Sequence, residues 1–302
     1  MSVSSEEVIS YHKGGKVAVR LPKELKTKED LCLAYTPGVA HAVKAVAADP
    51  SAVYDVTAKP NLVAVVSDGT AILGLGDLGA SASIPVMEGK AVLFKSFADV
   101  DAWPVPLGCC RVDGKDVGRT DPERVIAAVK AIAPQYGGIN LEDIASPACF
   151  EIEDRLDAEL DIPVFHDDQW GTAVIATAGV TNFALLKGKS LGELKVVVNG
   201  AGAAALAIAK LLISMQVGEL ILCDKYGLLY DGNPDMNPEQ ALVARQCSPK
   251  KIKGRLPDAI VDADVFIGVS APNCLKAEDV AKMAPKAAVF AMANPVPEIM
   301  PD

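Results

Sequence analysis

Two adjacent carboxylates, Asp167 and Asp168, follow a short apolar run near the middle of the chain. The run, residues 162–165, is typical of a strand, and an alanine-rich helical pattern begins directly after the two acids. Like charges a few ångströms apart repel each other, and a bound cation would remove that cost. The structural alternative is that Asp168 only caps the helix that follows.

A second acidic pair, Glu142 and Asp143, follows another strand-like segment at residues 138–141. Carboxylates with no His or Cys among the expected ligands are typical of a site for a hard cation, Mg²⁺ or Mn²⁺ and not Zn²⁺. The carboxyl ends of parallel strands meet at one rim of a sheet, so we expect both acidic pairs there. The alternative is that Glu142 and Asp143 lie in a solvated turn.

The stretch from Lys195 to Asp224 has the pattern of a dinucleotide-binding unit. An apolar strand at 195–199 leads into a Gly-x-Gly-x-x-Ala turn at 200–205, and a helical pattern follows. A second strand ends at Asp224, which we expect to bind the adenosine ribose. This order predicts binding of NAD or NADP, with close helix–strand packing alone as the alternative.

The small residues of that turn have separate expected roles. Gly200 permits the tight turn. Gly202 lets a pyrophosphate approach the backbone N–H groups of the following helix, whose first turn contains Ala203 and Ala205. The acid at the end of the second strand should repel a 2′-phosphate, while Lys225 beside it offsets that repulsion. The sequence therefore favours NAD over NADP by a small margin.

A second glycine-rich segment, residues 74–79, also matches the dinucleotide fingerprint. The apolar strand before it, 61–67, ends several residues too early, although Asp99 lies at a suitable distance. Pro85 interrupts the region where a helix should begin. We therefore predict a mobile glycine loop beside a cleft and no second dinucleotide turn.

Composition and charge narrow the class of protein. The 302 residues are 50% hydrophobic and carry a net charge of −10 with a pI near 4.9, which argues against nucleic acid and anionic membranes as partners. The cysteines include no Cys-x-x-Cys pair, which fits a reducing cytosol. No signal peptide or membrane-spanning run is evident, so we expect a soluble cytoplasmic protein.

The order of elements predicts an α/β fold in two domains. Residues 1–165 should form an N-terminal α/β domain that binds substrate and metal. Residues 166–302 should form a Rossmann-like, doubly wound NAD(P)-binding domain, with further strands near 264–268 and 287–291.

Two helices of the first domain carry specific expectations. Thr36 and Pro37 have the pattern of an N-cap and a first helical position, which would place Tyr35 just before a helix N-terminus. The helix after Ser146 has a charged face within residues 151–159 that we expect to be solvated.

Taken in order, these motifs resemble those of the malic enzymes, especially the shorter bacterial form. The matching segments lie between about Tyr11 and Asp302, at 35–39, 74–79, 88–90, 141–143, 166–172, 200–202 and 293–295. The resemblance implies a homodimer that oxidatively decarboxylates malate to pyruvate and CO₂, using NAD or NADP and a divalent cation.

The resemblance also implies a role for each residue near the acidic pairs. Glu142, Asp143 and Asp168 would hold Mg²⁺ or Mn²⁺, and the ion would stabilise the enolate left when CO₂ departs. Lys90 would take the proton of the malate C2 hydroxyl, and Asp167 would orient it. An ordinary lysine pKa is ~10.4, so this role requires surroundings that favour the neutral amine.

Two further residues receive roles from the resemblance. Tyr35 would donate the proton to C3 of enolpyruvate, and Asn294, at the cofactor rim, would hydrogen-bond a substrate carboxylate. Members of the family continue beyond the segment that matches Asn294 and Pro295. We therefore expect this chain alone to bind dinucleotide, turn malate over poorly and self-associate through its C-terminal half.

Two other functions stay open at the level of sequence. One is a dinucleotide-binding module without turnover. The other is a metal-free hydroxy-acid dehydrogenase, which would need a catalytic His–acid pair that includes His166.

Overall fold

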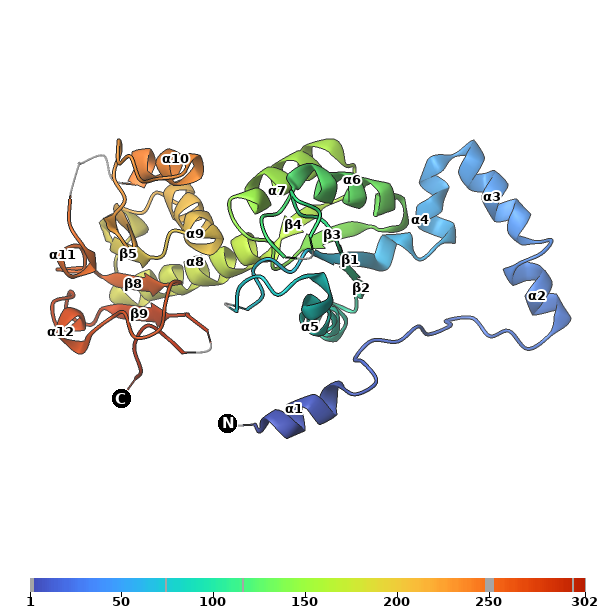
Figure 1. Cartoon of the computed structure of the whole chain (residues 1–302), viewed down its shortest axis with the longest axis horizontal. Coiled ribbons are helices and arrows are strands. Elements are labelled where there is room, and N and C mark those ends of the chain that lie inside the picture. Colours follow the sequence, from blue (N-terminus) through green and yellow to red (C-terminus); the bar gives the residue numbers. More distant parts are fainter. Residues whose placement is uncertain (1–2, 74, 116, 248–252, 295, 302) are drawn as a thin grey trace. The chain divides into compact units, whose positions relative to one another are not determined.

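The computed structural model describes residues 3–73, 75–115, 117–247, 253–294 and 296–301 (Figure 1). The chain divides into two compact units. The first unit contains Met1–Ile72, Asp77–Ile144 and Ile152–Phe165, and the second contains Leu73–Gly76, Ala145–Glu151 and His166–Asp302.

A four-stranded sheet forms the centre of the first unit. Its strand order is β2-β1-β3-β4, with bounds Asp101–Pro106, Leu62–Ser67, Gly138–Leu141 and Val164–His166. Strand β1 pairs in parallel with both β2 and β3. Its residues Ala64, Val65 and Val66 are completely buried, as expected of a central strand covered on both faces.

Three longer helices accompany this sheet. They are α5 (Ala80–Ala98), α6 (Pro122–Ile132) and α7 (Ala148–Glu159). Figure 1 shows α5 on one side of the sheet and α6 and α7 on the other. Asp121 caps the start of helix α6, because its side chain accepts hydrogen bonds from the backbone of Glu123 and Arg124.

Helix α5 corrects one prediction. It begins directly after Gly79 and continues for 19 residues, with Pro85 inside it, so the expected interruption is wrong. Proline removes one backbone hydrogen bond, but Ser83, Met87 and Ala91 form a buried stripe with one residue per turn. Packing of this stripe therefore outweighs the cost of proline inside the helix. Asp99 is the C-cap of this helix and does not stand at the end of a strand.

Helix α7 corrects a second prediction. Its charged face is only partly solvated, because Glu153 is buried together with Cys149, Ile152 and Leu156. These four positions have the i, i+3, i+4, i+7 spacing of one helix face. Glu153 therefore occupies a position of the buried stripe.

Four short helices precede β1, and none of them has a buried residue. They are α1 (Ser5–His12), α2 (Lys28–Ala34), α3 (Val39–Ala48) and α4 (Val53–Val56). Helices α1 and α2 begin with capping boxes at Ser4 and Thr27. The described residues also form 3₁₀ helices at Pro50–Ala52, Lys59–Asn61, Ala133–Gln135 and Leu191–Glu193.

The turn between α2 and α3 corrects a third prediction. Tyr35 is the C-cap of α2, and α3 begins at Val39 with Gly38 as its N-cap. The backbone N–H of Gly38 donates to Cys32 O at 2.8 Å, which closes the end of α2. Thr36 and Pro37 thus belong to this turn and do not start a helix.

The segment Lys28–Ala48 meets the length and hydropathy of a membrane span, lies near the N-terminus and is not buried. This resemblance to a membrane span rests on length and composition alone. In the structure the segment is divided between α2 and α3, which have 7 and 10 residues, each short of the ~20 that cross a bilayer.

The second unit contains a five-stranded sheet. Its order is β7-β6-β5-β8-β9, with bounds Gly227–Leu228, Glu219–Asp224, Lys195–Asn199, Val265–Gly268 and Ala288–Ala291. All neighbours pair in parallel except β6 and β7. The predicted strands are confirmed, whereas β7, with two residues, gives no sequence pattern and was not predicted.

The helices of the second unit are α8 (Asp167–Lys187), α9 (Ala203–Ser214), α10 (Pro238–Cys247), α11 (Leu256–Ala259) and α12 (Ala277–Val280). A core centred on Val197, Ile221 and Phe266 lies on one face of the sheet. Strand β5 has β6 on one side and β8 on the other. The strand order therefore reverses at β5, where open α/β sheets bind ligands at the carboxyl ends of their strands.

Candidate active site

Strand β3 delivers Glu142 and Asp143 to the carboxyl end of the first sheet, and both are buried. Glu142 accepts a hydrogen bond from the Asn140 side chain at 3.0 Å. Asp143 has a left-handed backbone with φ 54°, a conformation that aspartate tolerates better than most residues. The alternative of a solvated turn is therefore wrong, because the turn is buried.

Helix α5 brings Lys90 to this acidic pair. The Lys90 Nζ lies 3.2 Å from Glu142 Oε1, and the lysine side chain is 20% exposed. Met87 and Ala91 are buried on the same helix and fix its rotation, which directs Lys90 to the carboxyl end of β3. The first unit thus places a partly exposed amine against a buried carboxylate.

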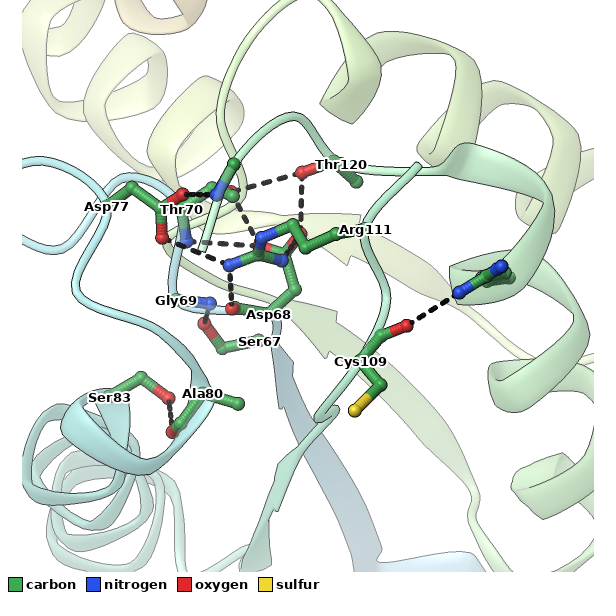
Figure 2. A network of polar contacts seen from close by, with 12 residues as sticks. Ser67, Asp68, Gly69, Thr70, Asp77, Ala80, Ser83, Cys109, Arg111 and Thr120 are labelled. Carbon is green, nitrogen blue, oxygen red and sulfur yellow. Dashed lines mark hydrogen bonds and ion pairs between the residues drawn. The ribbon is translucent and has the colours of Figure 1, made fainter. Parts of the chain in front are cut away.

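A buried ion-pair network fastens the segment that follows β1, as Figure 2 shows. Arg111 Nη1 donates to Asp68 Oδ2 at 2.8 Å, and Arg111 Nη2 donates to Asp68 O at 2.8 Å and to Asp77 Oδ1 at 3.1 Å. The hydroxyls of Thr70 and Thr120 donate to the same Asp68 carboxylate. Asp77 belongs to the glycine-rich segment 74–79, of which Gly74 falls outside the described residues.

Sequence reasoning missed this network. Asp68 and Arg111 are 43 residues apart, and neither stands in a periodic or motif-like pattern. A buried charge is costly unless it is paired and hydrogen-bonded. Such a pair becomes visible only when β1 and the loop after β2 are placed side by side.

Asp167 and Asp168 are the first two residues of α8, where the helix dipole favours negative charge. Asp168 is 38% exposed at its side chain, and its Oδ2 lies 3.8 Å from His166 Nε2. That separation is too long for a hydrogen bond. Asp168 thus remains accessible to solvent and to a ligand.

His166 argues against the metal-free dehydrogenase. It is completely buried, and burial lowers its pKa to about 4, against a smaller opposing effect of the Asp167 charge. The imidazole is therefore neutral at neutral pH, and with no exposed surface it cannot meet a substrate directly, as the catalytic base of that alternative must.

The turn after β5 has the geometry of a phosphate cradle. Gly200 has φ 138°, and a Cβ there would lie 2.7 Å from Val269 O, so the position requires glycine. Gly202 is the N-cap of α9, and a Cβ added to it would meet no atom within 4 Å. The N–H groups of the first turn of α9, which starts with Ala203, are therefore open to an anion, while Ala205 is buried against the sheet.

Strand β6 ends at Asp224, beside that turn. One carboxylate oxygen, Oδ1, accepts hydrogen bonds from the backbone of Tyr226 at 2.7 Å and Gly227 at 3.0 Å. These bonds orient the side chain and leave Oδ2 for another donor. The Nζ of Lys225 lies 4.9 Å from the centroid of the Tyr226 ring.

Two other predicted site residues lie on exposed segments. Asn294 follows β9 and is exposed, and its neighbour Pro295 falls outside the described residues. Tyr35 is 68% exposed at the end of α2.

The features of the two units together indicate a class of protein. The second is a Rossmann-like α/β unit whose glycine turn suits a dinucleotide, and the first presents a lysine and buried carboxylates at the carboxyl end of a parallel sheet. Such a combination is typical of a nicotinamide-dependent oxidoreductase.

Comparison with known proteins identifies the family. A model of the malic enzyme N-terminal domain matches residues 14–157, and one of the malic enzyme NAD-binding domain matches residues 170–300. A bifunctional malic/malolactic enzyme from Bacillus subtilis is 50% identical over 98% of this chain and 71% of that protein. The chain belongs to the malic enzyme family.

Further relatives agree in sequence and in structure. A NAD-dependent malic enzyme from Geobacillus stearothermophilus is 52% identical over 99% of this chain, which spans 60% of that relative's length. The crystal structure of a NAD-dependent malic enzyme from Thermotoga maritima matches with a TM-score of 0.91 at 46% identity, over 99% of this chain and 77% of that one.

Proposed function

We propose that the chain catalyses the oxidative decarboxylation of malate to pyruvate and CO₂ with NAD or NADP as the hydride acceptor. The observation that carries this proposal is the contact between Lys90 and Glu142 at the end of β3, in a chain that also has a dinucleotide turn. The names of relatives that are 50% and 52% identical support the reaction. They do not favour a binding module without turnover.

We propose that Glu142, Asp143 and Asp168 bind Mg²⁺ or Mn²⁺. The three side chains offer only carboxylate oxygens, the donor type that hard cations prefer, and they form a group that could hold a metal ion. When bound, such an ion acts as a Lewis acid toward the oxygens of the substrate.

The remaining roles belong to side chains of the chain itself. Lys90 accepts the proton of the malate C2 hydroxyl while the C2 hydride passes to the nicotinamide, and Asp167 orients Lys90. Loss of CO₂ from the resulting keto acid leaves the enolate of pyruvate, and Tyr35 supplies the proton that C3 then requires. Asn294 donates a hydrogen bond to a substrate carboxylate. These assignments rest on the family resemblance and on the chemistry of each group.

The overall activity is tested by following NAD(P)H formation from malate with Mn²⁺. We expect turnover that EDTA abolishes and a higher kcat/KM with NAD⁺ than with NADP⁺, because Asp224 repels a 2′-phosphate. Dinucleotide binding without turnover would favour the binding module. Turnover that EDTA leaves unchanged would contradict the metal site, and a higher kcat/KM with NADP⁺ would contradict the role of Asp224.

Asp168→Asn tests the metal proposal directly. The substitution keeps the size of the side chain and removes one anionic ligand, so we expect the affinity for Mn²⁺ to fall at least about tenfold. Titration of the protein with Mn²⁺, followed by electron paramagnetic resonance, measures that affinity.

Asp224→Asn is the matched control for this titration. It removes a carboxylate from the end of β6, beside the dinucleotide turn, and should leave the affinity for Mn²⁺ unchanged. Equal Mn²⁺ affinity in wild type and Asp168→Asn would exclude Asp168 as a ligand.

We also propose a cytoplasmic homodimer that binds neither nucleic acid nor membranes. The support is the net charge of −10 and the apolar side chains that α2 and α3 expose, including Leu31, Leu33 and Val43, since exposed apolar patches mark protein interfaces. Light scattering should give twice the chain mass, and Leu33→Glu should lower it. A monomeric wild type would contradict the proposal.

A further inference from the structure

Glu298 is a buried carboxylate that the proposed mechanism does not use. It lies seven residues beyond the end of β9 and has no exposed surface. Its Oε1 accepts a hydrogen bond from Ser270 N at 2.9 Å, and its Oε2 accepts one from Ala293 N at 3.0 Å. The two donors belong to different loops, one after β8 and the other after β9.

The backbone around Glu298 ties the same two loops together. Leu275 N donates to Glu298 O at 3.0 Å, and Asn273 N donates to Pro297 O at 3.0 Å. The strand end at Gly268 is shaped for the carboxylate, because a Cβ there would lie 2.3 Å from Glu298 Cδ. Glycine at that position therefore admits the side chain beneath the two loops.

The network continues to the end of β5. The Asn199 side chain donates to Ser270 Oγ at 2.8 Å and to Cys274 Sγ at 3.1 Å. The carboxyl ends of β5, β8 and β9 are thus joined through Asn199, Ser270 and Glu298. This joint lies on the side of the glycine turn opposite to β6 and Asp224.

The position of this joint indicates which half of the cofactor it serves. In a doubly wound sheet the pyrophosphate lies at the first strand's turn, and the two halves of the dinucleotide extend to either side. With its ribose on Asp224, the adenosine half would extend over β6. The nicotinamide half would then extend toward the ends of β8 and β9, the strands that Ser270 and Asn294 follow.

We propose that Glu298 is a positioning residue that fixes the rim of the nicotinamide subsite by holding the loops after β8 and β9. The inference rests on the proposed function, since it requires a nicotinamide dinucleotide on this sheet. A carboxylate suits the task because it offers one acceptor oxygen to each N–H. A glutamine would present an NH₂ group to one of the two donors and release that loop.

The test compares two ligands that share the adenosine half. NADH contains the nicotinamide and ADP-ribose does not, so the ratio of their dissociation constants isolates the subsite. Glu298→Gln should weaken NADH about tenfold and leave ADP-ribose within about twofold. NADH fluorescence and calorimetry with ADP-ribose measure the two constants.

A second variant and a matched control separate positioning from stability. Gly268→Ala displaces the Glu298 carboxylate without removing its charge, so it should cause the same selective loss. Asp264→Asn removes a comparably buried carboxylate at the opposite end of β8, where it accepts hydrogen bonds from Lys189 Nζ and Lys195 N at 2.7 and 3.1 Å. It should lower the unfolding temperature and leave the ratio unchanged.

Each outcome decides the proposal. Equal weakening of both ligands by Glu298→Gln, no weakening of either, or the same selective loss in Asp264→Asn would overturn it. A wild type that binds both ligands equally would overturn it as well, because the nicotinamide would then have no subsite. Selective loss in a chain that does not oxidise malate would refute the proposed reaction and uphold the role of Glu298.

Discussion

Replacement of Lys90 by alanine is expected to lower kcat for malate oxidation by roughly a thousandfold. A positioned general base contributes about 10² to 10⁴ to a rate, and Lys90 is the amine that α5 holds 3.2 Å from Glu142. Alanine is compatible with the helix, so the fold should be preserved. Initial rates of NADH formation with saturating malate and Mn²⁺ measure the effect, and circular dichroism checks the helix content.

Lys95→Ala is the matched control. Lys95 lies on the same helix but is exposed and pairs with Asp99 and Asp101, and such surface pairs contribute less than about 1 kcal/mol to stability. Its kcat should stay within about twofold of wild type. A Lys90→Ala variant that retained half the wild-type kcat would remove Lys90 from the mechanism.

The elements that sequence alone predicts best are those with continuous local patterns. Strand β5 and the turn Gly200–Gly202 were predicted because an uninterrupted apolar run, two glycines and an apolar helix follow one another without a gap. Each of these signals acts within a few residues. The tertiary fold buries these elements, but their strand, turn and helix conformations are already favoured by the local sequence.

Helix α5 and the turn at Tyr35 show where local patterns fail. Pro85 alone predicts an interruption of the helix. Burial of Met87 and Ala91 stabilises the helix by more than the missing backbone hydrogen bond at Pro85 destabilises it. Thr36 and Pro37 resemble a helix start, yet the backbone bond between Gly38 and Cys32 makes them part of a helix end. In both cases contacts formed outside the local pattern decide the structure.

The positioning of the candidate site depends on contacts that have no local pattern. Glu298 meets Ser270 across 28 positions of the chain, and Arg111 meets Asp68 across 43. A single Glu or Arg in a loop is usually solvated. Whether such a Glu or Arg is buried depends on which strand ends become neighbours. The strand order that decides this is set by the whole sheet and not by the local sequence.

Arg111→Met is expected to destabilise the first unit by about 3 to 5 kcal/mol, the range for breaking a buried ion pair from one side. Arg111 is 1% exposed and Asp68 is 0% exposed at the side chain. Methionine fills a similar volume but donates no hydrogen bond. The Asp68 carboxylate would then remain buried with neutral donors, the hydroxyls of Thr70 and Thr120 and the backbone N–H of Thr70, and without its positive partner (Figure 2). Urea unfolding followed by circular dichroism measures the loss.

Lys115→Ala controls for the loss of a positive charge near this loop. Lys115 pairs with Asp113 at the surface, where both side chains are at least half exposed, and its removal should change the free energy of unfolding by less than about 1 kcal/mol. A loss of similar size in both variants would show that net charge, and not the buried pair, accounts for the effect.

The double variant Asp68→Ala/Arg111→Met decides what the pair contributes. Removing both partners leaves neither charge of this pair buried alone, so its cost should be smaller than the sum of the two single losses by about 1 to 3 kcal/mol. Asp77, which belongs to the glycine-rich segment and also accepts a hydrogen bond from Arg111, loses that bond in both Arg111 variants alike. Strict additivity of the two losses would mean that Asp68 and Arg111 stabilise the segment independently, and that their ion pair is not what fastens it to β1.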